Sequence, residues 1–321
     1  MSSLFICLTP LQMLIVKRII QDRSLSNCII IVLAYQSNEK YDFYIKALKG
    51  VADKVLIVNV KPKNKLSTII YFLKIKWMMF KELKKAKFQI LYLASIDNKF
   101  VHSILSATTF SNLNTFDDGT ANIISNSSYY NYHDKNKDLK DKILGVFYGG
   151  VDTAWVRNKS NLHYTLYENI PNIIRNTVKI NLFNKVNDCV PNCSYVKKIF
   201  IGFPIDESNF TAVLINKILI DNGISHYFPH PREYSFQHLN AVEVIQTVRI
   251  IEDYCTEILN GDSRISLELY GFVSTSLLNL SGLSQRIKAF SFFDEDLMFR
   301  YKDYYVLAEQ LGVNLTHFER E

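Results

Sequence analysis

Short apolar segments alternate with longer helix-like segments along the chain, and this alternation is the strongest constraint on its fold. Residues 4–8, 28–34, 55–60 and 89–94 are runs of β-favouring residues, and helical patterns lie between them at residues 10–20, 41–48 and 66–87. Strands that alternate with helices are typical of a parallel sheet wrapped by helices. The sequence therefore predicts an α/β protein.

A second set of the same elements follows a polar stretch at residues 126–191. Residues 198–203, 225–228 and 266–269 are strand-like, residues 210–222 are helix-like, and residues 301–314 resemble a closing helix. A chain of 321 residues exceeds what one compact core usually holds. We therefore predict two α/β domains, residues 1–155 and 156–321, with a cleft between them.

The charge of the chain restricts its partners. A net charge of +6 is compatible with nucleic acid, an anionic membrane surface or an anionic small substrate. The 19 Tyr and 21 Phe residues are dispersed through apolar runs, which favours core positions over a base-stacking platform. We therefore expect no nucleic-acid partner.

The cysteines and the N-terminal segment bear on location. Five cysteines form an odd set without regular metal-ligand spacing, which favours a reducing compartment. The first residues lack a basic region ahead of their short apolar run, and no apolar stretch reaches about 18 residues. We expect a cytoplasmic protein.

Several polar residues fall just past the predicted strands. Ligands of open α/β sheets bind beyond the carboxyl ends of the strands. The residues in this position are Thr9, Asp117, Asp118, His230, Ser274, Thr275 and Ser276. Their placement suits a two-domain enzyme that binds a nucleotide sugar, although other doubly wound enzymes share it.

His230 lies between Pro229 and Pro231, next to Arg232. The two prolines keep the chain extended and would hold the imidazole rigidly. A rigid histidine near a phosphate could donate a hydrogen bond or a proton to it. The alternative is a turn histidine with no chemical role.

A second group of candidates surrounds Gly271. The hydroxyl residues Ser274, Thr275 and Ser276 precede a helix-like run and could bind a phosphate, or could serve as an ordinary N-cap. Glu268, which we place at the end of the preceding strand, could accept hydrogen bonds from a ribose or face solvent.

Asp117, Asp118 and Gly119 form an acidic turn after a strand. A metal site, a tight turn and a general base are all open readings, although the pair lacks the D-x-D spacing of metal-dependent glycosyltransferases. Asp206 and Glu207 also follow a strand, either as a base or as acids favoured at a helix start.

Residues 61–87 carry nine lysines and one glutamate, interleaved with Trp77 and other large apolar residues. This pattern predicts a helix for a membrane surface or a partner, or a buried helix with one solvated lysine face. Its apolar residues occupy more than one stripe, which favours contact on two sides.

Four motifs resemble one known family. Residues 6–12 (ICLTPLQ), 116–120 (FDDGT), 227–233 (YFPHPRE) and 269–276 (LYGFVSTS) are similar to motifs of the bacterial lipooligosaccharide and capsule sialyltransferases of glycosyltransferase family 52. The motifs occur in the same order and span nearly the whole chain. The absence of G-x-G-x-x-G after the first strand disfavours an NAD enzyme.

The resemblance implies a GT-B fold of two Rossmann-like domains that face a central cleft. It implies an inverting, metal-independent transfer of sialic acid from CMP-sialic acid, without a cofactor. The acceptor would be a terminal galactose of lipooligosaccharide or capsule, linked α2,3 or α2,6. It also implies a homodimer that exchanges a basic loop–helix–loop, here about residues 58–87, and association with the inner membrane.

The resemblance also implies roles for individual residues. His230 would be the general acid, and Ser274, Thr275 and Ser276 would hold the CMP phosphate, with Arg232, Glu268 and Gly271 nearby. The general base would be Asp206, or Asp117 or Asp118 by analogy with a related sialyltransferase family. Thr9 and Gln12 would approach the sialic acid or the acceptor. The alternatives are a GT-B transferase with another nucleotide sugar and a non-enzymatic basic surface module.

Overall fold

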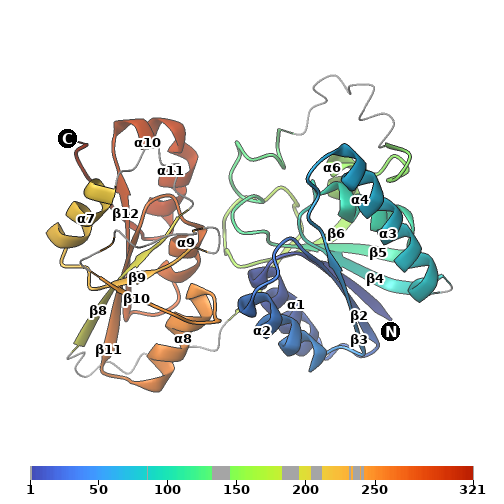
Figure 1. Ribbon diagram of the computed structural model, residues 1–321, viewed down its shortest axis with the longest axis horizontal. Coiled ribbons are helices and arrows are strands. Elements are labelled where there is room, and N and C mark those ends of the chain that lie inside the picture. Colours follow the sequence, from blue (N-terminus) through green and yellow to red (C-terminus); the bar gives the residue numbers. More distant parts are fainter. Residues whose placement is uncertain are drawn as a thin grey trace. The chain divides into compact units, whose positions relative to one another are not determined.

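The computed structural model describes residues 2–84, 86–131, 145–182, 195–203, 212–230, 233, 239 and 242–320. The chain divides into two compact units, Met1–Leu182 and Phe183–Glu321 (Figure 1). Each unit contains one parallel sheet with helices packed against it. The predicted α/β class is confirmed, and each unit is a Rossmann-like domain.

The first unit contains a seven-stranded sheet in the order β3-β2-β1-β4-β5-β6-β7. All its strand pairs are parallel. The order reverses between β1 and β4, which is the switch point of a doubly wound sheet. The elements in chain order are β1 (Ser3–Cys7), α1 (Pro10–Asp22), β2 (Cys28–Ala34), α2 (Glu39–Lys49), β3 (Lys54–Asn59), α3 (Lys65–Leu83), β4 (Lys87–Leu93), α4 (Lys99–Ser106), β5 (Thr109–Phe116), α6 (Thr153–Lys159), β6 (Ser160–Thr165) and β7 (Thr177–Lys179).

The second unit repeats this order in six parallel strands, β10-β9-β8-β11-β12-β13. Its switch point lies between β8 and β11, which pair directly. The elements are β8 (Tyr195–Ile201), α7 (Ala212–Asp221), β9 (His226–Phe228), β10 (Glu243–Val244), α8 (Ile251–Gly261), β11 (Ile265–Gly271), α9 (Thr275–Ser281), β12 (Ile287–Phe293), α10 (Glu295–Arg300), α11 (Lys302–Gln310) and β13 (Asn314–His317).

Two sequence predictions need correction here. The boundary between the units lies at residues 182 and 183 rather than near residue 155, because β6 and β7 extend the first sheet through parallel pairing with β5. The predicted closing helix at residues 301–314 is shorter, since α11 ends at Gln310 and β13 begins at Asn314 as the edge strand beside β12. Gly312, with a φ of 80°, lies in the turn between them.

Local signals explain where the main helices begin. Thr9 caps α1 and Pro10 occupies its first turn, where the missing N–H has no intrahelical partner to lose. Asn64 and Ser67 form a reciprocal capping box at the start of α3. No helix among the described residues combines the length and apolar character needed to cross a bilayer.

One face of α3 is built into the core of the first unit. Phe72, Ile75, Met79 and Leu83 are buried at helical spacing against β1, β2 and β4. The Phe72 ring stacks on Phe147 at a centroid distance of 5.1 Å and contacts Phe100 at 4.7 Å. The part of the chain predicted to be a basic helix is therefore a core element as well.

We expect Phe72→Ala to lower the free energy of unfolding by about 3–5 kcal/mol, because it removes a fully buried ring and leaves a cavity. Phe299→Ala is the matched control: Phe299 is 86% exposed, so its change should stay within about 0.5 kcal/mol. Urea unfolding followed by circular dichroism measures both variants. Equal losses for the two variants would contradict the packing described here.

Candidate functional site

The strand ends of the first sheet collect polar side chains around its switch point. Thr9 follows β1, Ser95 follows β4 and Asp118 follows β5. These three strands are parallel neighbours, so their carboxyl ends lie at one edge of the sheet. The sequence prediction that polar residues gather beyond the strands holds for this edge.

Asp118 is the centre of a hydrogen-bonded cluster at this edge. Its Oδ1 accepts from Gln12 Nε2 at 2.6 Å. Its Oδ2 accepts from the Ser95 hydroxyl at 2.6 Å and from the Tyr129 hydroxyl at 2.8 Å. Asp118 is partly buried, and three protein donors hold its carboxylate.

Gln12 is placed differently from the sequence prediction that it approaches a substrate. Its side chain is 0% exposed. Gln12 Oε1 accepts from the Leu8 amide at 2.6 Å, and Nε2 donates to Ser95 Oγ at 3.0 Å as well as to Asp118. Both polar atoms of its side chain are thus hydrogen-bonded inside the protein, and one of these bonds holds the Asp118 carboxylate.

Thr9 retains partial exposure at the same edge, with its hydroxyl accepting from the Gln12 amide at 3.3 Å as the cap of α1.

Ser95 and Tyr129 were not recognised from the sequence. Ser95 has a φ of 52°, in the left-handed region that a non-glycine residue rarely adopts. Burial and the neighbouring Asp118 carboxylate raise the pKa of the Tyr129 hydroxyl, so this group stays a donor.

Asp117 has surroundings opposite to those of its neighbour Asp118. It is 0% exposed, and its Oδ1 lies 2.9 Å from Nε2 of the equally buried His163. Its Oδ2 accepts from the Thr165 hydroxyl at 2.9 Å and from the Leu166 amide at 2.6 Å. These contacts join the end of β5 to β6 and give Asp117 no open path to a ligand.

The second sheet presents its own strand-end edge, where His230 follows β9. Glu233 closes the His230 turn: its Oε2 accepts from the His230 amide at 2.6 Å and its Oε1 accepts from the Tyr227 hydroxyl at 2.6 Å. Burial raises the pKa of Glu233, and these two hydrogen bonds oppose that rise. These contacts hold the His230 backbone just past β9, and the placement of its imidazole stays a prediction.

Gly202, at the end of β8, has to be a glycine because Glu233 and the His230 backbone pack closely against it. A Cβ on Gly202 would overlap Glu233 Oε2, and it would come within 2.8 Å of both the His230 amide nitrogen and the Tyr227 hydroxyl. Only a residue without a side chain fits there. Gly202 and Glu233 thus join the ends of β8 and β9, and neither was assigned a role from the sequence.

The hydroxyl triplet follows β11 as predicted. Ser274 is the N-cap residue of α9 and makes no side-chain capping hydrogen bond, while Thr275 and Ser276 form the first turn. All three side chains are half-buried. Gly271 at the strand end would place a Cβ 3.4 Å from Leu277 Cδ1, so its small size lets α9 pack close to β11.

Glu268 departs from its predicted place. It lies in the middle of β11 rather than at its end. Gly271, the last residue of β11, is three residues further on, a distance of about 10 Å along a strand. Its Oε2 accepts from the Tyr270 hydroxyl at 2.8 Å and lies 3.5 Å from Lys198 Nζ. These contacts lie on the sheet face, because a strand alternates its side chains and Glu268 and Tyr270 share one side.

Two predicted site residues, Asp206 and Arg232, lie outside the described residues. The described residues contain no group of three or more His, Cys, Asp or Glu side chains placed to hold a metal ion.

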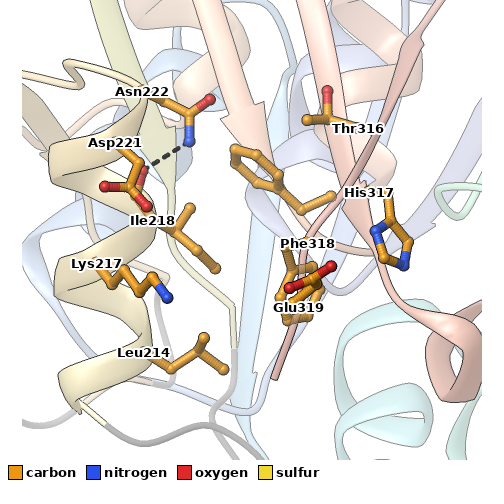
Figure 2. Close-up of a pocket in the computed structure, with 10 residues that line it drawn as sticks. Leu214, Lys217, Ile218, Asp221, Asn222, Thr316, His317, Phe318 and Glu319 are labelled. Atoms are coloured by element: carbon orange, nitrogen blue, oxygen red, sulfur yellow. Dashed lines mark hydrogen bonds between the residues drawn. The ribbon is translucent and has the colours of Figure 1, made fainter. Parts of the chain in front are cut away.

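A pocket of about 290 Å³ lies between α7 and the carboxyl end of β13 (Figure 2). Leu214, Lys217 and Ile218 line it from α7, and Thr316, His317, Phe318 and Glu319 line it from the end of β13 onward. It contains none of the predicted site residues. The geometry of the strand ends, rather than this pocket, therefore defines the candidate site.

Comparison with known proteins identifies the family. The family model of glycosyltransferase family 52 matches residues 26–290. A CMP-N-acetylneuraminate:beta-galactoside alpha-2,3-sialyltransferase of Pasteurella multocida is 31% identical over 98% of both chains. The chain therefore belongs to glycosyltransferase family 52, as the four sequence motifs predicted.

Two further relatives agree with this assignment, and one solved structure bears on the fold alone. N-acetyllactosaminide alpha-2,3-sialyltransferase of Neisseria meningitidis is 26% identical, with 99% of this chain and 86% of the relative covered. The protein of the same name from Haemophilus influenzae is 28% identical, with 87% and 88% covered. The structure of TcCGT1 in complex with UDP matches 99% of this chain and 86% of its own with a TM-score of 0.50 at 11% identity, which supports the GT-B fold alone.

We expect Asp117→Ala to lower the free energy of unfolding by about 3–5 kcal/mol, because it leaves the buried His163 and Thr165 donors and the partly buried Leu166 amide without an acceptor. Asp22→Ala removes an exposed ion pair with Arg18 and should cost at most about 1 kcal/mol. Urea unfolding compares the two variants. A native-like stability for Asp117→Ala would show that these buried contacts are not structural.

Proposed function

We propose that this chain is a sialyltransferase that transfers sialic acid from CMP-sialic acid to a terminal galactose, with an α2,3 linkage. The observation that carries the proposal is the relative named as a beta-galactoside alpha-2,3-sialyltransferase, which aligns over 98% of both chains. The predicted strand-end residues support it, since a histidine, three hydroxyl residues and a carboxylate lie just past the strands. We propose the galactose-terminated glycan of lipooligosaccharide or capsule as the acceptor.

The donor would bind at the strand ends of the second unit. Ser274, Thr275 and Ser276 at the start of α9 would donate hydrogen bonds to the CMP phosphate, and Gly271 keeps the helix close to the strand end. His230 would donate a proton to the departing phosphate as the general acid. Glu233 and Gly202 support this role because they hold the His230 turn. Arg232 would add positive charge beside it.

The reaction would invert the anomeric carbon. As CMP leaves, an oxocarbenium-like state forms, and the galactose hydroxyl attacks from the opposite face. One carboxylate must take the hydroxyl proton. Asp118 and Asp206 are the two candidates. Asp117 is left out because it is buried and hydrogen-bonded to His163 and Thr165, which suits a structural role. With an acid on the phosphate side and a base on the acceptor side, the mechanism requires no metal ion or cofactor.

The transfer of sialic acid from CMP-sialic acid to lactose, measured with EDTA present, tests the donor, the metal independence and the role of His230. We expect the native chain to form sialyllactose in EDTA, and His230→Ala to lower kcat by about 100-fold to 10,000-fold, the usual contribution of a general acid. His226→Ala is the control, because His226 lies at the start of β9 beside Glu243, away from the turn.

Three results, two from this assay and one from a comparison of CMP and UDP binding, would overturn parts of the proposal. Activity that requires a divalent cation would exclude metal independence, and native-like transfer by His230→Ala would exclude its role as the acid. Binding of UDP but not CMP would favour another nucleotide sugar. The variants Asp118→Asn and Asp206→Asn separate the two candidate bases, since loss of the base lowers kcat with little effect on the KM for lactose.

A homodimer through α3 is the partner arrangement that we propose. Opposite the buried stripe, α3 carries five exposed apolar side chains at spacings of four and three residues: Leu66, Ile70, Leu73, Trp77 and Phe80. Such a repeat of about 3.5 residues is the seam by which one helix packs along another. The α3 seam, defined by these five residues, supports exchange of the segment at about residues 58–87 between two copies.

Lysines flank the α3 seam and support a second contact, with an anionic membrane surface. Lys81 lies over the Trp77 ring at 5.2 Å, and Lys84 lies over the Phe80 ring at 4.3 Å. In both pairs the ammonium group lies over the face of the ring, and both lysines are exposed. We propose that the protein is cytoplasmic and associates peripherally with the inner membrane through such charges, each contributing about 1 kcal/mol near anionic lipid.

Leu73→Glu tests the α3 seam. We expect the native chain to sediment at equilibrium as a dimer, and the variant to raise the dimer Kd at least about 30-fold, because it places a charge at the centre of the apolar stripe. Phe299→Glu, at an exposed apolar site on α10, should leave the mass unchanged. A monomeric native chain would contradict the dimer. Pelleting with phosphatidylglycerol vesicles, at low and at high salt, measures the membrane contact in the same samples.

A further inference from the structure

We propose that Ser95 is a positioning residue for Asp118. The hydroxyls of Ser95 and Tyr129 donate to Oδ2 of Asp118, which leaves Oδ1 to accept a hydrogen bond from a sugar hydroxyl. This inference rests on the proposed function only in taking sialyl transfer as the activity that Asp118 serves. It holds whether Asp118 takes the proton of the hydroxyl or only orients it. Ser95 itself does not touch the substrate in this arrangement.

The described side chains fill three of the acceptor positions of the Asp118 carboxylate. An ionised carboxylate offers about four lone-pair positions, two on each oxygen. On Oδ2 of Asp118, the hydroxyls of Ser95 and Tyr129 occupy both, at 2.6 and 2.8 Å. On Oδ1, Gln12 Nε2 is the one side-chain donor that the described part of the chain supplies. The remaining position on Oδ1 is the one that a ligand hydroxyl can use.

The order of donors and acceptors fixes the orientation of the Ser95 hydroxyl. Ser95 Oγ accepts from Gln12 Nε2 at 3.0 Å and therefore donates its single hydrogen to Asp118. Gln12 is itself fixed, since its Oε1 accepts from the Leu8 amide. Gln12, Ser95 and Asp118 thus form a closed triangle, and rotation of the Asp118 carboxylate would break more than one of its hydrogen bonds at once.

The backbone of Ser95 adopts a left-handed conformation. Its φ of 52° is unfavourable for a residue with a Cβ, and Ser95 is 5% exposed, so packed neighbours hold it in this conformation. The conformation turns the chain directly after β4, at the switch point of the sheet. Glycine would adopt this φ without strain, but it would lack the hydroxyl that holds Asp118.

A double-mutant cycle tests this role. The variants are Ser95→Ala, Asp118→Asn and the two combined, and the readout is kcat/KM for transfer from CMP-sialic acid to lactose. Ser95→Ala should lower kcat/KM by about 10-fold to 100-fold, the effect of losing one hydrogen bond to a charged group. If Ser95 acts only through Asp118, the double variant should match Asp118→Asn alone.

Ser24 provides a matched control for the backbone. It also has a left-handed φ, of 48°, but it lies in an exposed turn after α1. We expect Ser24→Ala and Ser24→Gly to retain native kcat/KM. Ser95→Gly removes the strain and the hydroxyl together, so it should lose activity as Ser95→Ala does, even though its backbone is relaxed.

The outcomes separate this inference from the proposed function. Native transfer, measured first in the same assay, decides the function. Given native transfer, additive losses in the double variant would overturn the positioning role, as would native activity in Ser95→Gly or in Asp118→Asn. Non-additive losses together with native activity in the Ser24 variants would establish it.

Discussion

Parallel pairing on both sides of the first strand of each unit is the constraint on which the rest of the structure depends. β1 pairs with β2 and β4, and β8 pairs with β9 and β11, so the connections leave the first strand in opposite directions. The carboxyl ends of all these strands then lie at one edge of each sheet. Residues far apart in sequence, such as Gln12 and Asp118, meet there because the hydrogen-bonded order of the parallel strands brings their carboxyl ends together.

The adjacent aspartates show how finely this constraint acts. Asp117 continues the direction of β5 toward β6, where His163 and Thr165 receive it inside the protein. Asp118, one residue later, turns to the opposite side and enters the cluster around β1 and β4. The next residue, Gly119, has a φ of 60°, a conformation that glycine adopts freely. Two identical side chains thus have different roles, one in the core and one at the surface.

Much of the fold and part of the candidate site could be predicted from the sequence. The buried parallel strands β1 and β2 are continuous apolar runs, and Pro10 and Gly223 mark helix ends, so their positions follow from local chemistry. β5 is less visible, because its sequence TFSNLNTF lacks a continuous apolar run: its first half carries exposed polar residues, and Asn114 and Thr115 are buried although polar. Hydroxyl residues after a strand were visible for Ser274, Thr275 and Ser276, but not for Ser95, whose backbone conformation has no local signature.

By itself the sequence determined the α/β class, the two-unit organisation, the family motifs and the residues that follow the strands, since these depend on periodicity and on local backbone preferences. The tertiary structure decided which of those residues are buried and which partners each of them contacts. Gln12 is wholly buried and Glu268 lies on a sheet face, while Ser95, Tyr129, Gly202 and Glu233 hold Asp118 and the His230 turn in place. These assignments depend on contacts between distant strands, which are set by sheet order and register and not by any local pattern in the chain.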